Sequence, residues 1–387
     1  MDTSFLFDLA LILLVTKALG LLSRRIHLPQ VVGALFAGIL LGPAVLKIIL
    51  PNEVLSALAE VGVILLMFTA GLETDFKQLR SSLKSSMVIA VIGVIVPLGG
   101  GYLLAWLFGL DIMKCMFIGV VLTATSVSIT VETLQEMGKL KSKAGTSILG
   151  AAVIDDILGI VILSLIISVG DNDIQASALG FTFLKICGFF IFAVVCGFVV
   201  YKLFEFLSVK LGRKRRLSIF GLAFCFLLAY AAEQFGVADI TGAYFAGLVL
   251  CNSSAEKYIE EKNTVLSYMF FSPIFFISVG LMTSFDGLGR ESILFAVLLL
   301  AVAMITKLAG CGLGALICGF SNRESIQIGT GMISRGEVAI IVATKGVAAG
   351  LMDVGYFSSV VIVVIITTLI TPILLKAAFR EKKPEIQ

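Results

Sequence analysis

The chain has 387 residues, of which 59% are hydrophobic and only 14% are charged. A soluble domain needs more charge than this to cover its surface, so the composition excludes a soluble protein, and we expect no nucleic-acid partner. The formal net charge of +3 is small. It becomes informative only when the charged residues are placed along the chain.

Apolar stretches recur along the whole chain, each long enough to cross about 30 Å of hydrocarbon as a helix. They predict about thirteen transmembrane helices and an all-α polytopic membrane protein. The predicted spans are roughly 4–22, 29–48, 54–74, 86–110, 113–132, 144–168, 178–207, 217–236, 238–252, 265–284, 292–318, 326–350 and 355–378. We therefore expect residues 1–387 to form a single membrane unit with no soluble domain.

Basic residues gather in every second loop of this pattern. The loops between them hold only Lys47, Lys114 and Arg290. The basic loops and tail contain Arg24, Arg25, Lys77, Arg80, Lys84, Lys139, Lys141, Lys143, Lys210, Arg213, Lys214, Arg215, Arg216, Lys257, Lys262, Arg323, Lys376, Arg380, Lys382 and Lys383. By the positive-inside rule, the N-terminus lies outside a bacterial cytoplasmic membrane and the C-terminus lies in the cytoplasm.

The sequence contains an internal repeat. VVGALFAGILL at 31–41 matches ITGAYFAGLVL at 240–250, 209 positions later, and the same offset places AGLETDF at 70–76 on VGLMTSF at 279–285. The paired spans are seven apart, so they cross the membrane in opposite directions. We expect inverted repeats over about 29–168 and 238–378, an architecture typical of secondary transporters.

The sixth predicted span carries two adjacent acids, Asp155 and Asp156, with apolar residues on both sides. Ionised carboxylates are costly in hydrocarbon. Neighbouring helical positions point about 100° apart, so one acid can face a cavity while the other faces a helix. The alternative is a polar pair that only holds helices together, but a single Asn would do this at less cost.

The eleventh span carries Lys307 about sixteen residues from its start. An isolated ammonium in hydrocarbon is also costly, and an ion pair with one of the two aspartates would relieve that cost. The alternative is a lysine whose ammonium reaches the membrane surface. Its distance from both ends of the span argues against this.

Two spans are interrupted by small polar residues, TATSVSIT at 123–130 and GTGMISRGEVA at 329–339. The repeat offset places Thr125 on Ser334 and Ser126 on Arg335, so the interruptions fall at equivalent places. Broken helices at matching positions of two repeats indicate a transport site. The alternative for the Thr and Ser residues is helix–helix packing.

Three motifs, TATSVSIT, AAVIDDILGIVILSL and ISRGEVAIIVATKG, together resemble the second family of monovalent cation:proton antiporters. The resemblance covers the whole chain, and it is greatest for the spore-germination Na⁺(K⁺)/H⁺ antiporters. It implies an NhaA-like fold with two discontinuous crossing helices, in a homodimer that works by an elevator motion. It also implies mobile core helices at about 86–168 and 292–378, with the remainder serving dimerisation.

The resemblance assigns roles to residues of the site. Asp156 would bind the cation and the proton in turn, and Asp155 would form an exchangeable salt bridge with Lys307. Thr125 and Ser126 would lie at the crossover beside the site, with Thr125 as a further cation ligand. The transported species would be protons and Na⁺, K⁺ or Li⁺, and no cofactor is implied.

Arg335 and Glu337 match the family's charged pair at the second helix break, where they would offset helix dipoles. No nucleotide-binding domain follows the last span, so we expect no nucleotide gating. Relatives gated in that way usually carry Gln at the first acid, and Asp155 instead favours the charge-moving, sodium-exchanging branch. The likeness to germination proteins adds the spore inner membrane as an expected location.

Three other functions remain as alternatives. A cation channel would need a continuous pore, usually on a subunit axis. An intramembrane aspartyl protease would need two carboxylates that face each other, whereas Asp155 and Asp156 diverge on one helix. A membrane sensor with a transporter fold is the third, and an absence of flux in purified vesicles would favour it.

Overall fold

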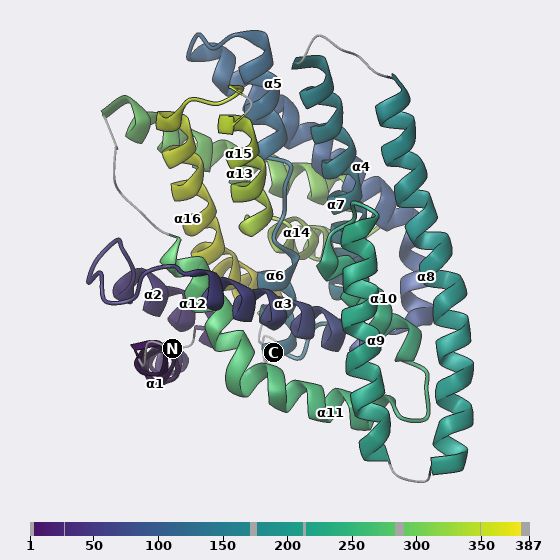
Figure 1. Ribbon diagram of the computed structural model, residues 1–387. Coiled ribbons are helices and arrows are strands. Elements are labelled where there is room, and N and C mark those ends of the chain that lie inside the picture. Colours follow the sequence, from purple (N-terminus) through teal and green to yellow (C-terminus); the bar gives the residue numbers. More distant parts are fainter. Residues whose placement is uncertain are drawn as a thin grey trace, which may run out of the picture.

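The computed structural model describes residues 4–26, 28–170, 176–211, 214–282, 290–348 and 350–380 (Figure 1). Within these ranges the chain is helical, with short turns and no strand. The first half contains α1 (Ser4–Arg25), α2 (Gln30–Leu41), α3 (Glu53–Glu73), α4 (Phe76–Leu107), α5 (Ile112–Val121), α6 (Val127–Glu136), α7 (Lys143–Gly170) and α8 (Ala176–Leu211). The second half contains α9 (Lys214–Gln234), α10 (Asp239–Leu250), α11 (Glu256–Leu266), the π-helical turn η1 (Ser267–Phe271), α12 (Ser272–Leu281), α13 (Arg290–Ile317), α14 (Asn322–Gly331), α15 (Glu337–Ala348) and α16 (Val354–Phe379).

The helices match the predicted spans. Among the described residues, nine helices are long and apolar enough to cross a membrane. The span predicted at 29–48 is shorter than expected, because its helix α2 ends at Leu41, just before Gly42 and Pro43. The span at 238–252 corresponds to α10, and each interrupted span corresponds to a pair of half-helices, α5 with α6 and α14 with α15. Helices α1 and α8 are mostly exposed. Only 17% of the apolar stretch of α1 and 22% of that of α8 are buried inside the protein, so their other apolar side chains are left to face lipid.

The tenth span begins earlier than predicted. The polar segment before residue 265 is already helical in α11, and it continues through η1 into α12, so that one element runs from Glu256 to Leu281. Polar residues are tolerated at this end because a helix longer than the hydrocarbon thickness extends into the interfacial region. The π turn lies inside this element, and such turns often mark functional sites.

Glycines make the contacts between the two repeats. A Cβ on Gly38 of α2 would lie 2.7 Å from the Cα of Gly280 in α12, and one on Gly71 of α3 would lie 2.9 Å from the Cα of Gly247 in α10. Within the sequence repeat, however, Gly38 corresponds to Gly247, and Gly71 corresponds to Gly280. Gly38 therefore contacts the repeat equivalent of Gly71, and Gly71 contacts the repeat equivalent of Gly38. A two-fold relation between inverted repeats requires this exchange.

The same relation holds one helix earlier in each half. Gly33 of α2 faces the carbonyl of Leu19 in α1, and Gly242 of α10 faces the carbonyl of Leu228 in α9. Both members of the second pair lie 209 positions after those of the first. The observed symmetry therefore includes α1 and α9. The end of the second repeated segment, where positions 283 and 285 match Thr74 and Phe76, lies outside the described residues.

The half-helices meet in the middle of the molecule. In Figure 1, α6 and α14 approach each other at the centre, with α4, α7, α13 and α16 around them. Helix α4 packs extensively against both α7 and α13. This arrangement brings the acids of α7 and the lysine of α13 to the same depth as the two breaks.

Candidate functional site

The two interrupted helices cross at their breaks. The backbone N–H of Ser126 donates to the carbonyl of Ser334 at 2.8 Å, and the Ser334 hydroxyl donates to the carbonyl of Ser126 at 2.7 Å. These reciprocal bonds satisfy backbone groups that the broken helices leave free, as a hydrocarbon environment demands. The prediction of two discontinuous crossing helices is confirmed.

Further hydroxyls of the Thr and Ser run hold the crossing together. Thr130 donates to the carbonyl of Gly331 at 2.7 Å, and its hydroxyl lies 3.0 Å from that of Ser334. The hydroxyls of Ser126 and Ser128 are 3.2 Å apart. Part of this run therefore has the packing role that the sequence left open as an alternative.

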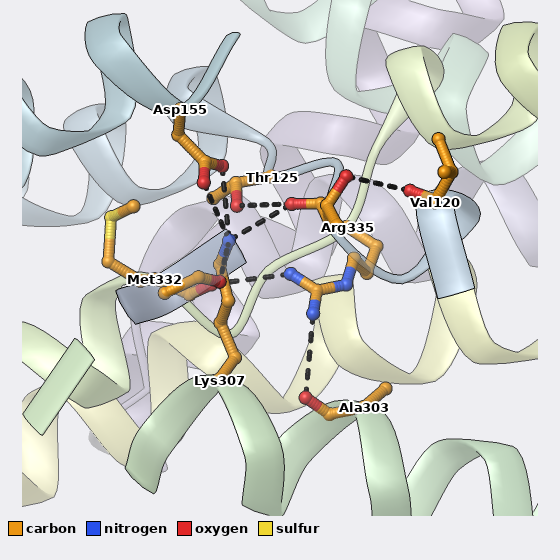
Figure 2. A network of polar contacts seen from close by, with 9 residues as sticks. Val120, Thr125, Asp155, Ala303, Lys307, Met332 and Arg335 are labelled. Atoms are coloured by element: carbon orange, nitrogen blue, oxygen red, sulfur yellow. Dashed lines mark hydrogen bonds and ion pairs between the residues drawn. The ribbon is translucent and has the colours of Figure 1, made fainter. Parts of the chain in front are cut away.

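Lys307 and Asp155 form a buried ion pair beside the crossing (Figure 2). The Lys307 ammonium lies 2.9 and 3.1 Å from the two carboxylate oxygens of Asp155. It also donates to the carbonyls of Gly93 and Thr123, both at 2.9 Å. Lys307 is 0% exposed and Asp155 is 2% exposed. The three donors of the ammonium are thus all used, which is the condition for burying such a charge.

Asp156 has a different environment from its neighbour. It is half-buried and lines a small cavity with Val127 of α6, Thr241 and Tyr244 of α10, and Met67 of α3. The hydroxyl of Thr241 has no hydrogen-bond partner within the described residues. The two acids therefore diverge, one toward a fixed ammonium and the other toward a cavity between neighbouring helices.

Thr125 and Ser126 lie in the first break, both buried. The Thr125 hydroxyl lies 3.4 Å from the carbonyl of Thr123, which itself accepts from Lys307. The break therefore joins the ion pair to the crossing point. These hydroxyl and carbonyl oxygens are hard ligands of the kind that suit a monovalent cation.

Arg335 occupies the second break and is buried. Its guanidinium makes long contacts with the carbonyls of Met332, at 3.4 Å, and Ala303, at 3.5 Å (Figure 2). Its Nε has no partner among the described groups. The guanidinium therefore lies beside the C-terminal end of α14. Glu337 is the first residue of α15, and its side chain lies outside the described part of the structure.

One buried acid, Glu132 of α6, was not predicted from the sequence. Its side chain is 7% exposed, and its Oε2 has no hydrogen-bond partner among the described residues. The available signal was the acid's position, because it lies only six residues after Ser126 in a span expected to cross the membrane.

Residues 10–381 match the family model described as "Sodium/hydrogen exchanger, transmembrane". The chain is 43% identical to the "Na(+)/H(+)-K(+) antiporter GerN" of Bacillus cereus, over 99% of this chain and 98% of that protein. It is 37% identical to the "Na(+)/H(+) antiporter" of Enterococcus hirae, over 96% and 97% of the two chains.

The fold is similar to that of the sodium proton antiporter MjNhaP1 from Methanocaldococcus jannaschii. The TM-score is 0.71 at 16% sequence identity, and the match covers 98% of this chain and 97% of the other. A likeness at this identity concerns the fold alone. It confirms the prediction of an all-α, NhaA-like architecture.

Proposed function

The chain belongs to the sodium/hydrogen exchanger family, and from this premise we propose that it exchanges a monovalent cation, Na⁺, K⁺ or Li⁺, for protons across the bacterial cell membrane. The names of its relatives from Bacillus cereus and Enterococcus hirae support antiport. The germination branch, which the motifs resemble, adds the spore inner membrane as a proposed location.

One observation supports this mechanism most directly: adjacent carboxylates have different environments. Asp155 is bound to Lys307, whereas Asp156 lines a cavity. A single carboxylate cannot hold a proton and a cation together. If Asp156 is exposed first to one side of the membrane and then to the other, competition between the two ions makes their exchange obligatory. Thr125 and Ser126 would add neutral oxygens to the bound cation.

The ion pair gives the cycle a second titrating group. We infer that a cation reaching Asp156 also draws Asp155 away from Lys307, after which the lysine can release a proton. The cycle would then move net charge. Arg335 and Glu337 would offset the helix dipoles at the second break.

We further propose an elevator motion in a homodimer, with the N-terminus outside and the C-terminus in the cytoplasm. The moving core would comprise about 86–168 and 292–378, and the remainder would form the dimerisation domain. The position of the Asp156 cavity supports this division. It is lined by α6 and α7 on the core side and by α3 and α10 on the other. A sliding boundary there would expose Asp156 alternately.

The test is proton flux in liposomes that contain the purified protein and a pH dye. After a proton gradient is imposed, Na⁺, K⁺, Li⁺ or choline is added outside. We expect Na⁺ or K⁺ to collapse the gradient and choline to have no effect. Asp156→Asn should abolish the exchange, because an amide cannot carry a proton in exchange for a cation. Cation leakage without proton movement would instead identify a channel.

A further inference from the structure

A second cavity lies apart from the cavity of Asp156. It has a volume of about 590 Å³ and lies among α1, α2, α6, η1 and α12. This volume is enough for a cation with several waters, since each water occupies about 30 Å³ in the liquid. Its polar lining comprises Thr16, Lys17, Gln30, Glu132, Glu136, Tyr268 and Ser272.

Glu132 is the unusual member of this lining. It is 93% buried, since its exposed fraction is 7%, yet its Oε2 has no hydrogen-bond partner in the described part of the chain. A buried polar atom without a partner lowers the stability of the fold, and a charged one lowers it more. A ligand in the cavity would relieve this cost. The occupants that fit the carboxylate are a cation or a hydrogen-bond donor.

The other charges at the cavity leave Glu132 as the group available for a cation. Glu136 accepts the backbone N–H of Gln30 at 2.7 and 2.9 Å, so its carboxylate already caps the start of α2. Lys17 lines the cavity but is exposed, and its long side chain can keep its ammonium in water. No ion pair joins Lys17 to Glu132 within the described residues.

Neutral oxygens surround the same space. Tyr268 lies in the π-helical turn, and its hydroxyl reaches α6, where it lies 3.4 Å from Oε1 of Gln135 and also within hydrogen-bonding reach of the Glu132 carboxyl. A phenolic hydroxyl keeps lone pairs available for a cation while it donates its proton. Thr16 and Ser272 also line the cavity. Their hydroxyls bond to the carbonyl of Ile12 and to the hydroxyl of Ser267, and each keeps lone pairs that can accept. A carboxylate with several hydroxyls is a hard oxygen donor set.

The position of this cavity along α6 indicates where it lies relative to Asp156. Val127 lines the Asp156 cavity and Glu132 lines this one, five residues later on the same helix. At 1.5 Å per residue the two positions are about 7.5 Å apart along the axis. The loop that follows α6 carries Lys139 and Lys141 and belongs to the basic face of the protein. Glu132 therefore lies between that face and Asp156.

We propose that Glu132 and the hydroxyls around it bind a monovalent cation on its way between the cytoplasmic face and Asp156. This inference rests on the proposed exchange for its direction of travel. The site would concentrate the cation at the mouth of the route. Because it is separate from Asp156, its loss should weaken capture of the cation without stopping the exchange step.

The first test is Glu132→Gln, measured in oriented vesicles that receive Na⁺ on one face at a time. We expect the KM for Na⁺ on the cytoplasmic face to rise about tenfold, with the maximal rate within about twofold of wild type. The KM on the opposite face should not change. Glu132→Asp should retain part of the affinity because it keeps the charge. The matched control is Glu60→Gln, which removes an exposed carboxylate that lines neither cavity.

The second test does not depend on transport. Crystals of wild type, Glu132→Gln and Asp156→Asn are grown with Tl⁺, a monovalent cation with an anomalous signal. We expect a Tl⁺ peak beside Glu132 in wild type and Asp156→Asn, and its loss in Glu132→Gln.

Absence of this peak from wild type would overturn the site, whatever the flux measurements give. A peak with an unchanged KM would overturn its place on the route. If wild type shows no exchange at all, the proposed function fails, and the Tl⁺ peak still decides the binding site.

Discussion

Removal of Lys307 should clearly destabilise the protein. Its ammonium is fully buried and bonds to Asp155 and to two backbone carbonyls. Lys307→Ala leaves the Asp155 carboxylate buried and unpaired, which typically destabilises a protein by about 3–5 kcal/mol. We therefore expect a clear fall in the thermal unfolding temperature of the detergent-solubilised variant.

The double variant Asp155→Asn with Lys307→Met is the control, because replacing a buried ion pair by neutral groups is often neutral for stability. It should recover most of the lost unfolding temperature. Equal instability of the single and double variants would show that packing, not charge, causes the loss. Lys307→Ala also bears on charge movement, since a reconstituted variant that still generates current would exclude the lysine from that step.

Charged residues were the part of the site that the sequence predicted best. Asp155, Asp156 and Lys307 stand out because ionisable groups are rare in apolar spans. The helical angle between the acids predicts that they diverge, but not which of them meets the lysine, because that depends on the rotation of α7 about its axis. Glu132 was missed because a polar run beside a helix break also fits the end of a span.

At the scale of helices, the glycine contacts between the repeats set how closely α2 and α3 approach their partners. A Cβ on Gly38 or Gly71 would overlap the facing backbone of α12 or α10, and backbone cannot move aside as a side chain can. Gly38→Ala and Gly71→Ala should therefore each destabilise the protein by about 1–3 kcal/mol or more through overpacking. Thermal unfolding in detergent measures the effect.

Gly99→Ala is the matched control within α4. A Cβ at this position would meet nothing within 4 Å, so only helix propensity changes. Its unfolding temperature should equal or slightly exceed that of wild type, since alanine is favoured over glycine in a helix by about 1 kcal/mol. If all three alanine variants behaved alike, the close approach of the repeats would not depend on glycine.

Helix positions followed from apolar length, whereas helix ends and irregular turns did not. The span predicted at 265–284 begins at Glu256 because a helix can continue beyond the hydrocarbon, where apolar length gives no signal. The π turn was not predictable, since it depends on tertiary partners. Asn263, just before it, donates to the carbonyl of Leu65 at 2.9 Å and also bonds the hydroxyl of Thr69 in α3.

At the scale of the whole molecule, the proposed elevator requires the core to slide past the rest of the chain. Gln135 of α6 and Tyr268 of the π turn touch across the proposed boundary, at 3.4 Å. In a variant without its native cysteines, we expect Gln135→Cys with Tyr268→Cys to transport until a short bifunctional thiol reagent links the two positions. Linking should stop exchange, and a reductant that cleaves the reagent should restore it.

The control pair is Lys114→Cys with Asp353→Cys, whose native side chains meet at 2.8 Å and both belong to the proposed moving core. Exchange that survives the first link, or stops with the second, would contradict a rigid core that moves as one body.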